Sequence, residues 1–121
     1  MNIFKVQAAD RFDNTEFTNE VEDGRARSIY SAYTCPGCAT PIGFHKRDFQ
    51  DVAKQQRTTL ASGVATRFDE FARTNGIGTE DFLDWICPKC RLAARVYVQF
   101  WAGGRHGDCG ITLLTVIEAQ T

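Results

Sequence analysis

The clearest pattern of hydrophobic and polar positions lies in the middle of the chain and is helical. Small and apolar residues recur at every third or fourth position over Leu60–Ala72, with polar or charged residues between them, as on an amphipathic helix. Asp48 is a suitable N-cap and Gly76 a suitable stop, so the pattern predicts helix within residues 49–74. One unbroken helix of that length would measure about 39 Å. That length favours a break near Thr58, although a single helix stays open.

Four other segments predict β-structure. Ile3–Val6 and Ser28–Thr34 are rich in residues that favour strands. Residues 95–101 alternate between apolar and polar side chains, whereas Ile111–Ile117 is apolar on both faces, which is typical of a central strand. The glycine-rich residues 102–110 join the last two segments and predict the loop of a hairpin.

The length of 121 residues suits one domain, and no internal repeat occurs apart from a doubled CPxC motif. Strands and an acidic loop are expected over residues 1–34. The two cysteine motifs and the helical segment occupy residues 35–90, and the β-hairpin occupies residues 91–121. The expected fold class is α+β, with a small antiparallel β-sheet and a helical insertion between the cysteine motifs. The polar stretch at 10–24 is expected to be a loop held by Phe12, Phe17 and Val21.

The doubled motif carries the strongest chemical signal. The chain contains Cys35-Pro-Gly-Cys38 and Cys87-Pro-Lys-Cys90. Two cysteines separated by two residues form a tight turn in which both sulfurs lie on the same side. Two such turns that face each other present four thiolates in a tetrahedron, the arrangement that suits Zn²⁺. Because protein thiolates would fill all four positions, the sequence predicts a structural zinc ion rather than a catalytic one.

These two turns and the strand-like segments before them resemble a zinc ribbon, in which each of two hairpins supplies one cysteine-bearing knuckle. The resemblance covers only the two CPxC turns and their flanking strands. It differs from the common pattern in its spacing, because 48 residues separate Cys38 from Cys87 where about 15–20 are usual. The resemblance therefore implies a ribbon that carries the helical segment as an insertion.

Other interpretations of the cysteines and their neighbours remain open. One CPxC pair on its own could be redox-active, and an iron centre is a further alternative to zinc. Cys109 lies beside His106 and Asp108, so a Cys-His-Asp nucleophile set is an alternative to a plain hairpin turn or to a recognition loop that uses Arg105. Catalytic groups usually converge from distant parts of a fold, which favours the turn or the recognition loop. His45 is a candidate ligand as well, although four cysteines already complete the shell.

Composition and charge exclude several classes of protein. The chain is 43% hydrophobic and 24% charged, has a formal net charge of −1 and contains no long apolar run. It is therefore not expected to be disordered, membrane-spanning or strongly cationic. The N-terminal residues lack the features of a signal peptide, and we expect a cytoplasmic protein whose thiols stay reduced. Residues 24–57 and 85–121, which hold the cysteines, are basic, whereas residues 1–23 and 58–84 are acidic.

We expect a zinc-binding, non-enzymatic interaction module or adaptor that docks on a protein or nucleoprotein complex. A phage or mobile-element inhibitor of such a complex would be one form of it. Near-zero net charge and blocks of alternating sign favour specific docking. An acidic cluster of Glu80, Asp81 and Asp84 is expected at a helix start on a solvated face.

A nucleic-acid-binding zinc-ribbon protein is the alternative, with exposed Tyr33, Tyr97 or Trp101 stacking on bases. A zinc-supported nuclease or other hydrolase is a third possibility. It would need a further cluster of catalytic groups that the sequence does not offer, so no catalytic residue is assigned. The candidates for partner binding are mostly basic residues near the cysteines: Arg25, Arg27, Lys46, Arg47, Lys89, Arg91, Arg95, Trp101, Arg105 and His106.

Overall fold

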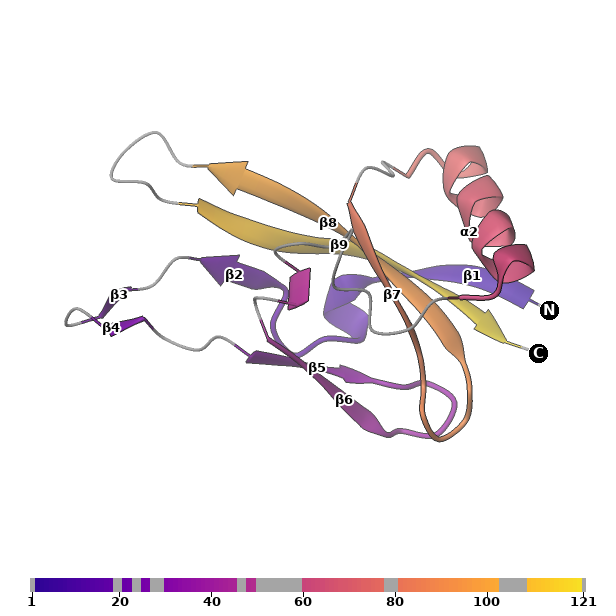
Figure 1. The fold of residues 1–121 in the computed structure, drawn as a ribbon, viewed down its shortest axis with the longest axis horizontal. Coiled ribbons are helices and arrows are strands. Elements are labelled where there is room, and N and C mark those ends of the chain that lie inside the picture. Colours follow the sequence, from indigo (N-terminus) through magenta and orange to yellow (C-terminus); the bar gives the residue numbers. More distant parts are fainter. Residues whose placement is uncertain are drawn as a thin grey trace.

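The structure is a computed structural model that describes residues 2–18, 21–22, 25–26, 30–45, 48–49, 60–77, 81–102 and 109–120. Figure 1 shows the order of the elements along the chain. They are β1 (Asn2–Gln7), the short 3-10 helix η1 (Ala8–Asp10), β2 (Glu16–Thr18), β3 (Val21–Glu22), β4 (Arg25–Ala26), β5 (Tyr30–Thr34), β6 (Pro41–His45), α2 (Ser62–Thr74), β7 (Phe82–Ile86), β8 (Ala93–Ala102) and β9 (Cys109–Gln120).

The main sheet is antiparallel and is organised around β9. Its strand order is β1-β9-β8-β7, and β2 also pairs with β9. The second half of β9 pairs with β1 and its first half pairs with β2, while β8 runs beside it over almost its whole length. The prediction of a central strand at 111–117 is therefore confirmed, as is the hairpin that joins it to β8. Leu114 is an extra residue at a β-bulge, because Tyr97 pairs with Thr115 and Val98 pairs with Leu113.

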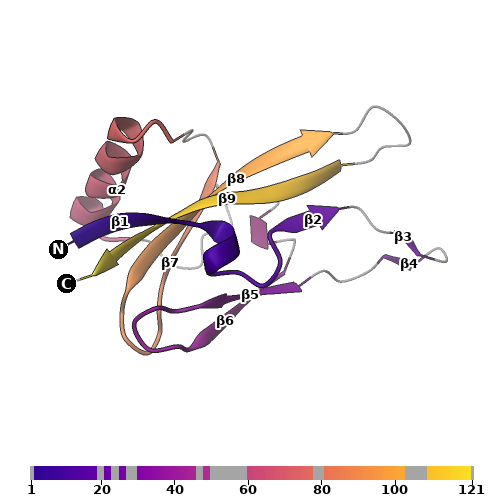
Figure 2. The ribbon, with the colours of Figure 1, turned by 180° about the vertical axis from the view of Figure 1, so that it is seen from behind.

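The sheet lies between α2 on one face and the β5–β6 hairpin on the other (Figures 1 and 2). Val96 and Tyr97 are neighbours on β8, so their side chains leave opposite faces of the sheet, and they belong to two different buried clusters. On the Tyr97 face, Phe68 and Ala72 of α2 are buried. On the Val96 face lies Phe44 of β6. Both faces of the sheet are therefore used to build the core.

Helix α2 confirms only part of the predicted helical region. Ala61 has extended backbone angles, with φ −56° and ψ 142°, so the helix begins at Ser62 and a single helix over 49–74 is wrong. Asp48 and Phe49 are helical, and residues 50–59 lie outside the described part of the chain. The helix ends where expected, since Asn75 follows its last turn and Gly76 has φ +66°.

The acidic segment at 10–24 is more ordered than the predicted loop. It contains the end of η1 and the short strands β2 and β3, because two of the expected anchors, Phe12 and Phe17, are buried. Arg11, next to η1, forms a bidentate ion pair with Glu118 of β9. Its Nε and Nη2 donate to the two carboxylate oxygens at 2.9 Å and 3.1 Å. The Tyr33 hydroxyl of β5 also donates to that carboxylate. This buried network holds β5, and with it the first cysteine turn, against the central strand.

Candidate metal centre

Each CPxC motif forms the turn of a β-hairpin. The first turn joins β5 to β6, where Thr34 pairs with Pro41, and the second joins β7 to β8, where Ile86 pairs with Ala93. Figure 1 shows the two hairpin turns side by side, next to the end of the main sheet. The sequence-based expectation that each motif sits on a strand-turn-strand unit therefore agrees with the structure.

Hydrogen bonds within the first turn fix its backbone. The Cys35 N–H donates to the Thr40 carbonyl at 3.1 Å, and the Ala39 N–H donates back to the Cys35 carbonyl at 2.8 Å. Ala39 adopts φ +60°, a left-handed conformation that is uncommon for residues other than glycine. The turn keeps this strained residue because the hydrogen bonds on both sides of it determine the backbone path.

The second turn repeats the first one position by position. The Cys87 N–H donates to the Leu92 carbonyl at 2.8 Å, and the Arg91 N–H donates to the Cys87 carbonyl at 3.0 Å. Arg91 adopts φ +66°, as Ala39 does four residues after the first cysteine of its own motif. Two stretches far apart in the sequence thus build the same turn, and the four cysteines occupy equivalent places in the two copies.

The four sulfurs converge into one cluster. All lie within 4.8 Å of one another, and the closest contacts join the two turns, with Cys35 Sγ 3.4 Å from Cys90 Sγ and Cys38 Sγ 3.6 Å from Cys87 Sγ. These distances far exceed the roughly 2.05 Å of a disulfide bond. They are close to the roughly 3.8 Å between sulfurs expected for tetrahedral zinc with Zn–S bonds of about 2.3 Å. The donor set and its spacing therefore fit a metal ion.

Gly37 allows the turns to approach each other this closely. A Cβ atom at Gly37 would lie 3.0 Å from Cys90 Sγ and 3.8 Å from Cys35 Sγ. The first of these contacts is tighter than a normal van der Waals distance between carbon and sulfur. A side chain at this position would push the second turn away from the first, and the four sulfurs would separate.

The four thiols differ in their surroundings. Cys35 and Cys87 are buried, Cys38 is half-buried and Cys90 is exposed. Burial raises the pKa of Cys35 to about 12, whereas hydrogen bonds from the side chain and backbone of Thr40 lower the pKa of Cys38 to about 6. Because metals bind thiolates rather than thiols, loading the cluster must displace the proton held by Cys35.

Aromatic side chains form the core beneath the two cysteine turns. Tyr33 and Trp85 each lie two residues before the first cysteine of a motif, and their ring centroids are 4.8 Å apart. Phe44 lies 5.2 Å from the Trp85 ring and Phe12 lies 6.1 Å from it. Aromatic pairs at these distances add roughly 0.5–1.5 kcal/mol each beyond the area they bury. This buried cluster, which also contains Cys35 and Cys87, packs the two cysteine turns against the core.

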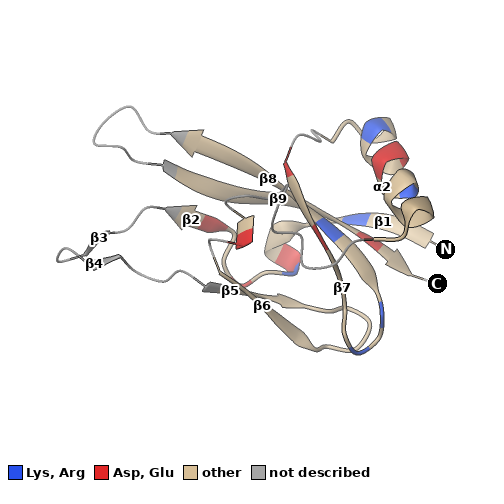
Figure 3. Cartoon of the chain, viewed as in Figure 1, with Lys and Arg blue, Asp and Glu red and all other residues tan. Residues whose placement is uncertain are grey.

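The structure places the candidates for partner binding in different surroundings. Lys89 and Arg91 are exposed on the second turn, and Figure 3 shows basic residues at this turn between β7 and β8. Trp101 is half-buried, packs over Gly110 and donates from Nε1 to Thr112 Oγ1 at 3.2 Å. The backbone of Arg25 lies in β4. The remaining basic candidates other than Arg95, together with the histidine, lie outside the described residues: Arg27, Lys46, Arg47, Arg105 and His106.

Arg95 corrects the sequence-based expectation, because it is an internal residue. Its side chain is only 3% exposed, and Nε and Nη2 donate to the two oxygens of Asp84 at 2.6 Å and 3.1 Å. Nη1 donates to Asp69 of α2, and the guanidinium carbon lies 3.9 Å from the centroid of the Phe82 ring. Arg95 thus connects the sheet to α2 and has no surface to offer a partner. Asp84 is likewise buried in β7, not on a solvated helix start.

The aromatic residues expected to stack on bases are also mostly internal. Tyr33 and Tyr97 are fully buried, so the expectation that they are exposed is wrong. His45 is half-buried, and the described candidate ligands that converge are the four cysteines alone. Cys109 is the first residue of β9, and the adjoining residues 103–108 are not among those described.

Comparisons with known proteins add no relative to this picture. No family model matches the chain, and neither the curated proteins nor the solved structures contain a match. Among the described residues, none of the helical structure has the length and apolar character needed to cross a membrane. The function therefore has to be argued from the site itself.

Proposed function

We propose that this chain is a zinc-binding protein of zinc-ribbon-like construction, in which a structural four-cysteine centre supports a non-enzymatic docking module. The observation that carries the proposal is the convergence of four sulfurs within 4.8 Å from two turns with the same backbone hydrogen bonds. A redox pair needs only two cysteines, so it does not account for the second copy of the turn. Thiolate sulfur in a tetrahedron is the donor set that zinc prefers in structural sites.

A structural role follows from the number of ligands. Cys35, Cys38, Cys87 and Cys90 would fill all four positions around zinc, which leaves none for a water molecule or a substrate. When bound, the metal would supply a cross-link between the β5–β6 hairpin and the β7–β8 hairpin. Each hairpin continues into the aromatic core, so the metal stabilises the face of the sheet opposite α2.

Protein docking is favoured over nucleic-acid binding because the fold uses basic and aromatic residues internally. Arg11 and Arg95 are held by carboxylates, and Tyr33 and Tyr97 are buried, so these four residues cannot contact phosphates or stack on bases. Nucleic-acid affinity depends mainly on exposed Lys and Arg that displace counterions. A near-neutral surface is better suited to a specific partner, either a protein or a nucleoprotein complex.

Removing the metal tests the structural role. Protein purified without added chelator should contain one zinc per chain by elemental analysis. A chelator should then abolish or strongly lower the melting transition, because structural zinc sites can contribute roughly 10–16 kcal/mol of apparent binding free energy. A Cys38→Ser variant should show the same loss without chelator. A melting curve unchanged after complete removal of the metal would contradict the proposal.

Titration with oligonucleotides separates the two classes of partner. At about 50 mM salt a nucleic-acid-binding protein should bind single- or double-stranded oligonucleotides, and its affinity should fall steeply as salt is raised. We expect no such binding. Complexes isolated from cells should instead survive nuclease treatment, and salt-dependent oligonucleotide binding would refute the docking assignment while leaving the zinc site intact.

A further inference from the structure

The four cysteines are not equally accessible, and the difference is concentrated at Cys90. Cys35 and Cys87 are buried and Cys38 is half-buried, whereas Cys90 is exposed. Once a metal is bound, all four ligands are thiolates. They then no longer differ in the fraction of thiolate, which normally makes one cysteine more nucleophilic than another. Exposure then decides which sulfur a reagent in solution reaches first.

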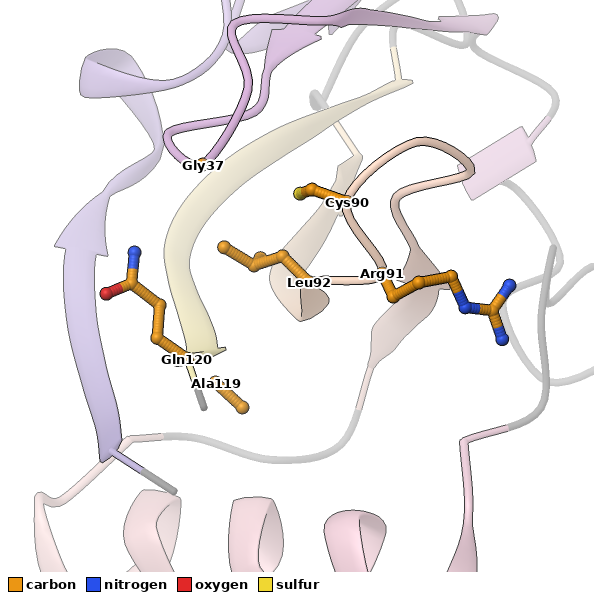
Figure 4. Close-up of a pocket in the computed structure, with 6 residues that line it drawn as sticks. All are labelled: Gly37, Cys90, Arg91, Leu92, Ala119 and Gln120. Atoms are coloured by element: carbon orange, nitrogen blue, oxygen red, sulfur yellow. The ribbon is translucent and has the colours of Figure 1, made fainter.

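A pocket of about 260 Å³ opens beside this sulfur. It is lined by Gly37, Cys90, Arg91, Leu92, Ala119 and Gln120 (Figure 4). The Arg91 side chain points away from the Cys90 sulfur, while Leu92 and Gln120 lie on the same side as the sulfur. A water molecule takes about 30 Å³ in the liquid, and a hydroperoxide group is only a little larger. Small uncharged oxidants can therefore reach Cys90 through this pocket.

Cys35 is placed to complete the reaction. Its sulfur lies 3.4 Å from Cys90 Sγ, which is the shorter of the two contacts between the turns. A disulfide needs about 2.05 Å, so the two sulfurs have to approach by little more than about 1 Å. The bond would join the β5–β6 hairpin to the β7–β8 hairpin, which is the same connection that the metal makes.

We propose that Cys90 is an oxidation site for small hydroperoxides and that Cys35 resolves it to a disulfide, which releases the metal; this inference rests on the proposed zinc function. In the first step the Cys90 thiolate attacks the terminal oxygen of the peroxide, an S–O bond forms, the O–O bond breaks, and hydroxide leaves from hydrogen peroxide or an alkoxide from an organic hydroperoxide. In the second step the Cys35 thiolate attacks the Cys90 sulfur, an S–S bond forms, the S–O bond breaks and hydroxide leaves. Two thiolates lose two electrons, and the peroxide is reduced.

As a consequence, the Cys35–Cys90 disulfide replaces the zinc ion as the connection between the two hairpins. Loss of two thiolate ligands leaves Cys38 and Cys87, which are too few to hold zinc tightly. The two hairpins stay joined through the disulfide, and a thiol reductant restores the ligands. The docking module would therefore sense oxidant by exchanging one connection between its hairpins for another.

The test uses zinc-loaded protein treated with limiting hydrogen peroxide. Zinc release is followed with a chromophoric chelator, and the oxidised sulfurs are mapped by mass spectrometry after the remaining thiols are blocked. Digestion should avoid trypsin, because Lys89 and Arg91 flank Cys90. We expect Cys90 to be the first residue oxidised, and the Cys35–Cys90 disulfide to form in step with zinc release.

Two matched variants keep all four ligands. Gln120→Phe adds a ring at the wall of the pocket and should slow oxidation and zinc release several-fold. Gln99→Phe, at an exposed position on β8 outside the pocket, should leave both rates unchanged. First oxidation at Cys38, equal oxidation of all four sulfurs, or equal slowing by the two variants would overturn the inference alone. Protein that holds no zinc before peroxide is added would instead overturn the proposed function, and this inference with it.

Discussion

Replacing Arg95 with methionine tests whether this residue is an internal connector, as the structure indicates, or a surface contact, as its charge suggests. Methionine fills much of the same volume but cannot bond the two carboxylates. Asp69 is 63% exposed and regains water when the guanidinium is removed. Asp84 is only 4% exposed, so its charge would stay buried without a partner.

Breaking a buried ion pair by removing one partner typically costs about 3–5 kcal/mol. Total stabilities of about 5–15 kcal/mol are usual, so we expect Arg95→Met to lose a large share of the fold's stability. With urea m values of about 1–3 kcal/mol/M for small proteins, the unfolding midpoint should fall by about 1 M or more.

Urea unfolding of the zinc-loaded protein, followed by the fluorescence of buried Trp85, measures this loss. Lys89→Met is the matched control, because Lys89 is exposed on the second cysteine turn and surface changes usually stay within about 0.5 kcal/mol. Arg95→Met combined with Asp84→Leu should recover most of the lost stability, since no buried charge then remains. A loss below about 1 kcal/mol for Arg95→Met would refute the reasoning, because a buried carboxylate without a partner should lower the free energy of unfolding by more than that.

Two further predictions concern the first cysteine turn and its support. Gly37→Ala should weaken zinc affinity in competition with a chelator, because the new methyl group lies 3.0 Å from Cys90 Sγ. Gly63→Ala should leave affinity unchanged and stabilise α2 by about 0.5–1 kcal/mol, because the new methyl group meets nothing within 4 Å beyond its chain neighbours and the helix backbone. Equal affinities for the two variants would contradict the steric argument. Asp13 Oδ1 accepts from the Ala32 N–H at 2.9 Å, and this bond lowers the pKa of Asp13. Its contribution to stability is therefore present above the unfolded pKa of about 3.9 and is lost as the pH falls through the lower folded pKa. Asp13→Asn should lose less stability than the wild type in melts recorded over that acid range, and parallel losses would count against the assignment.

The features predicted correctly from the sequence are those that depend on local pattern. The doubled CPxC motif indicates both the four cysteines that converge and the hairpin turns that carry them, because the geometry of a two-residue spacing is set within the motif. The segment at 111–117, which has apolar residues on both faces, indicates a central strand. The end of α2 near Gly76 also follows from local backbone preferences.

The features that sequence reasoning missed depend on partners far away in the chain. A basic residue in an alternating strand suggests a surface position, but Arg95 finds Asp84 and Asp69 at separations of 11 and 26 residues. Tyr33 meets Glu118 across 85 residues. The one signal for the latter pair is that Glu118 is the single charged residue of the mostly apolar β9. Apolar periodicity also continued through Ala61, because it describes which side chains face the core and not whether the backbone is helical.

The central place of β9 determines the order in which this protein can fold on the ribosome. Asn2 pairs with Gln120 and Phe17 pairs with Ile111, so β1 and β2 cannot form these pairs until β9 has been synthesised. All four cysteines of the two turns are synthesised before β9, because Cys90 precedes Cys109 in the chain. Native contacts that span so much of the chain close slowly, on the scale of milliseconds to seconds for β-rich domains. We therefore expect β1 and β2 to join the sheet last, after β9 has left the ribosome.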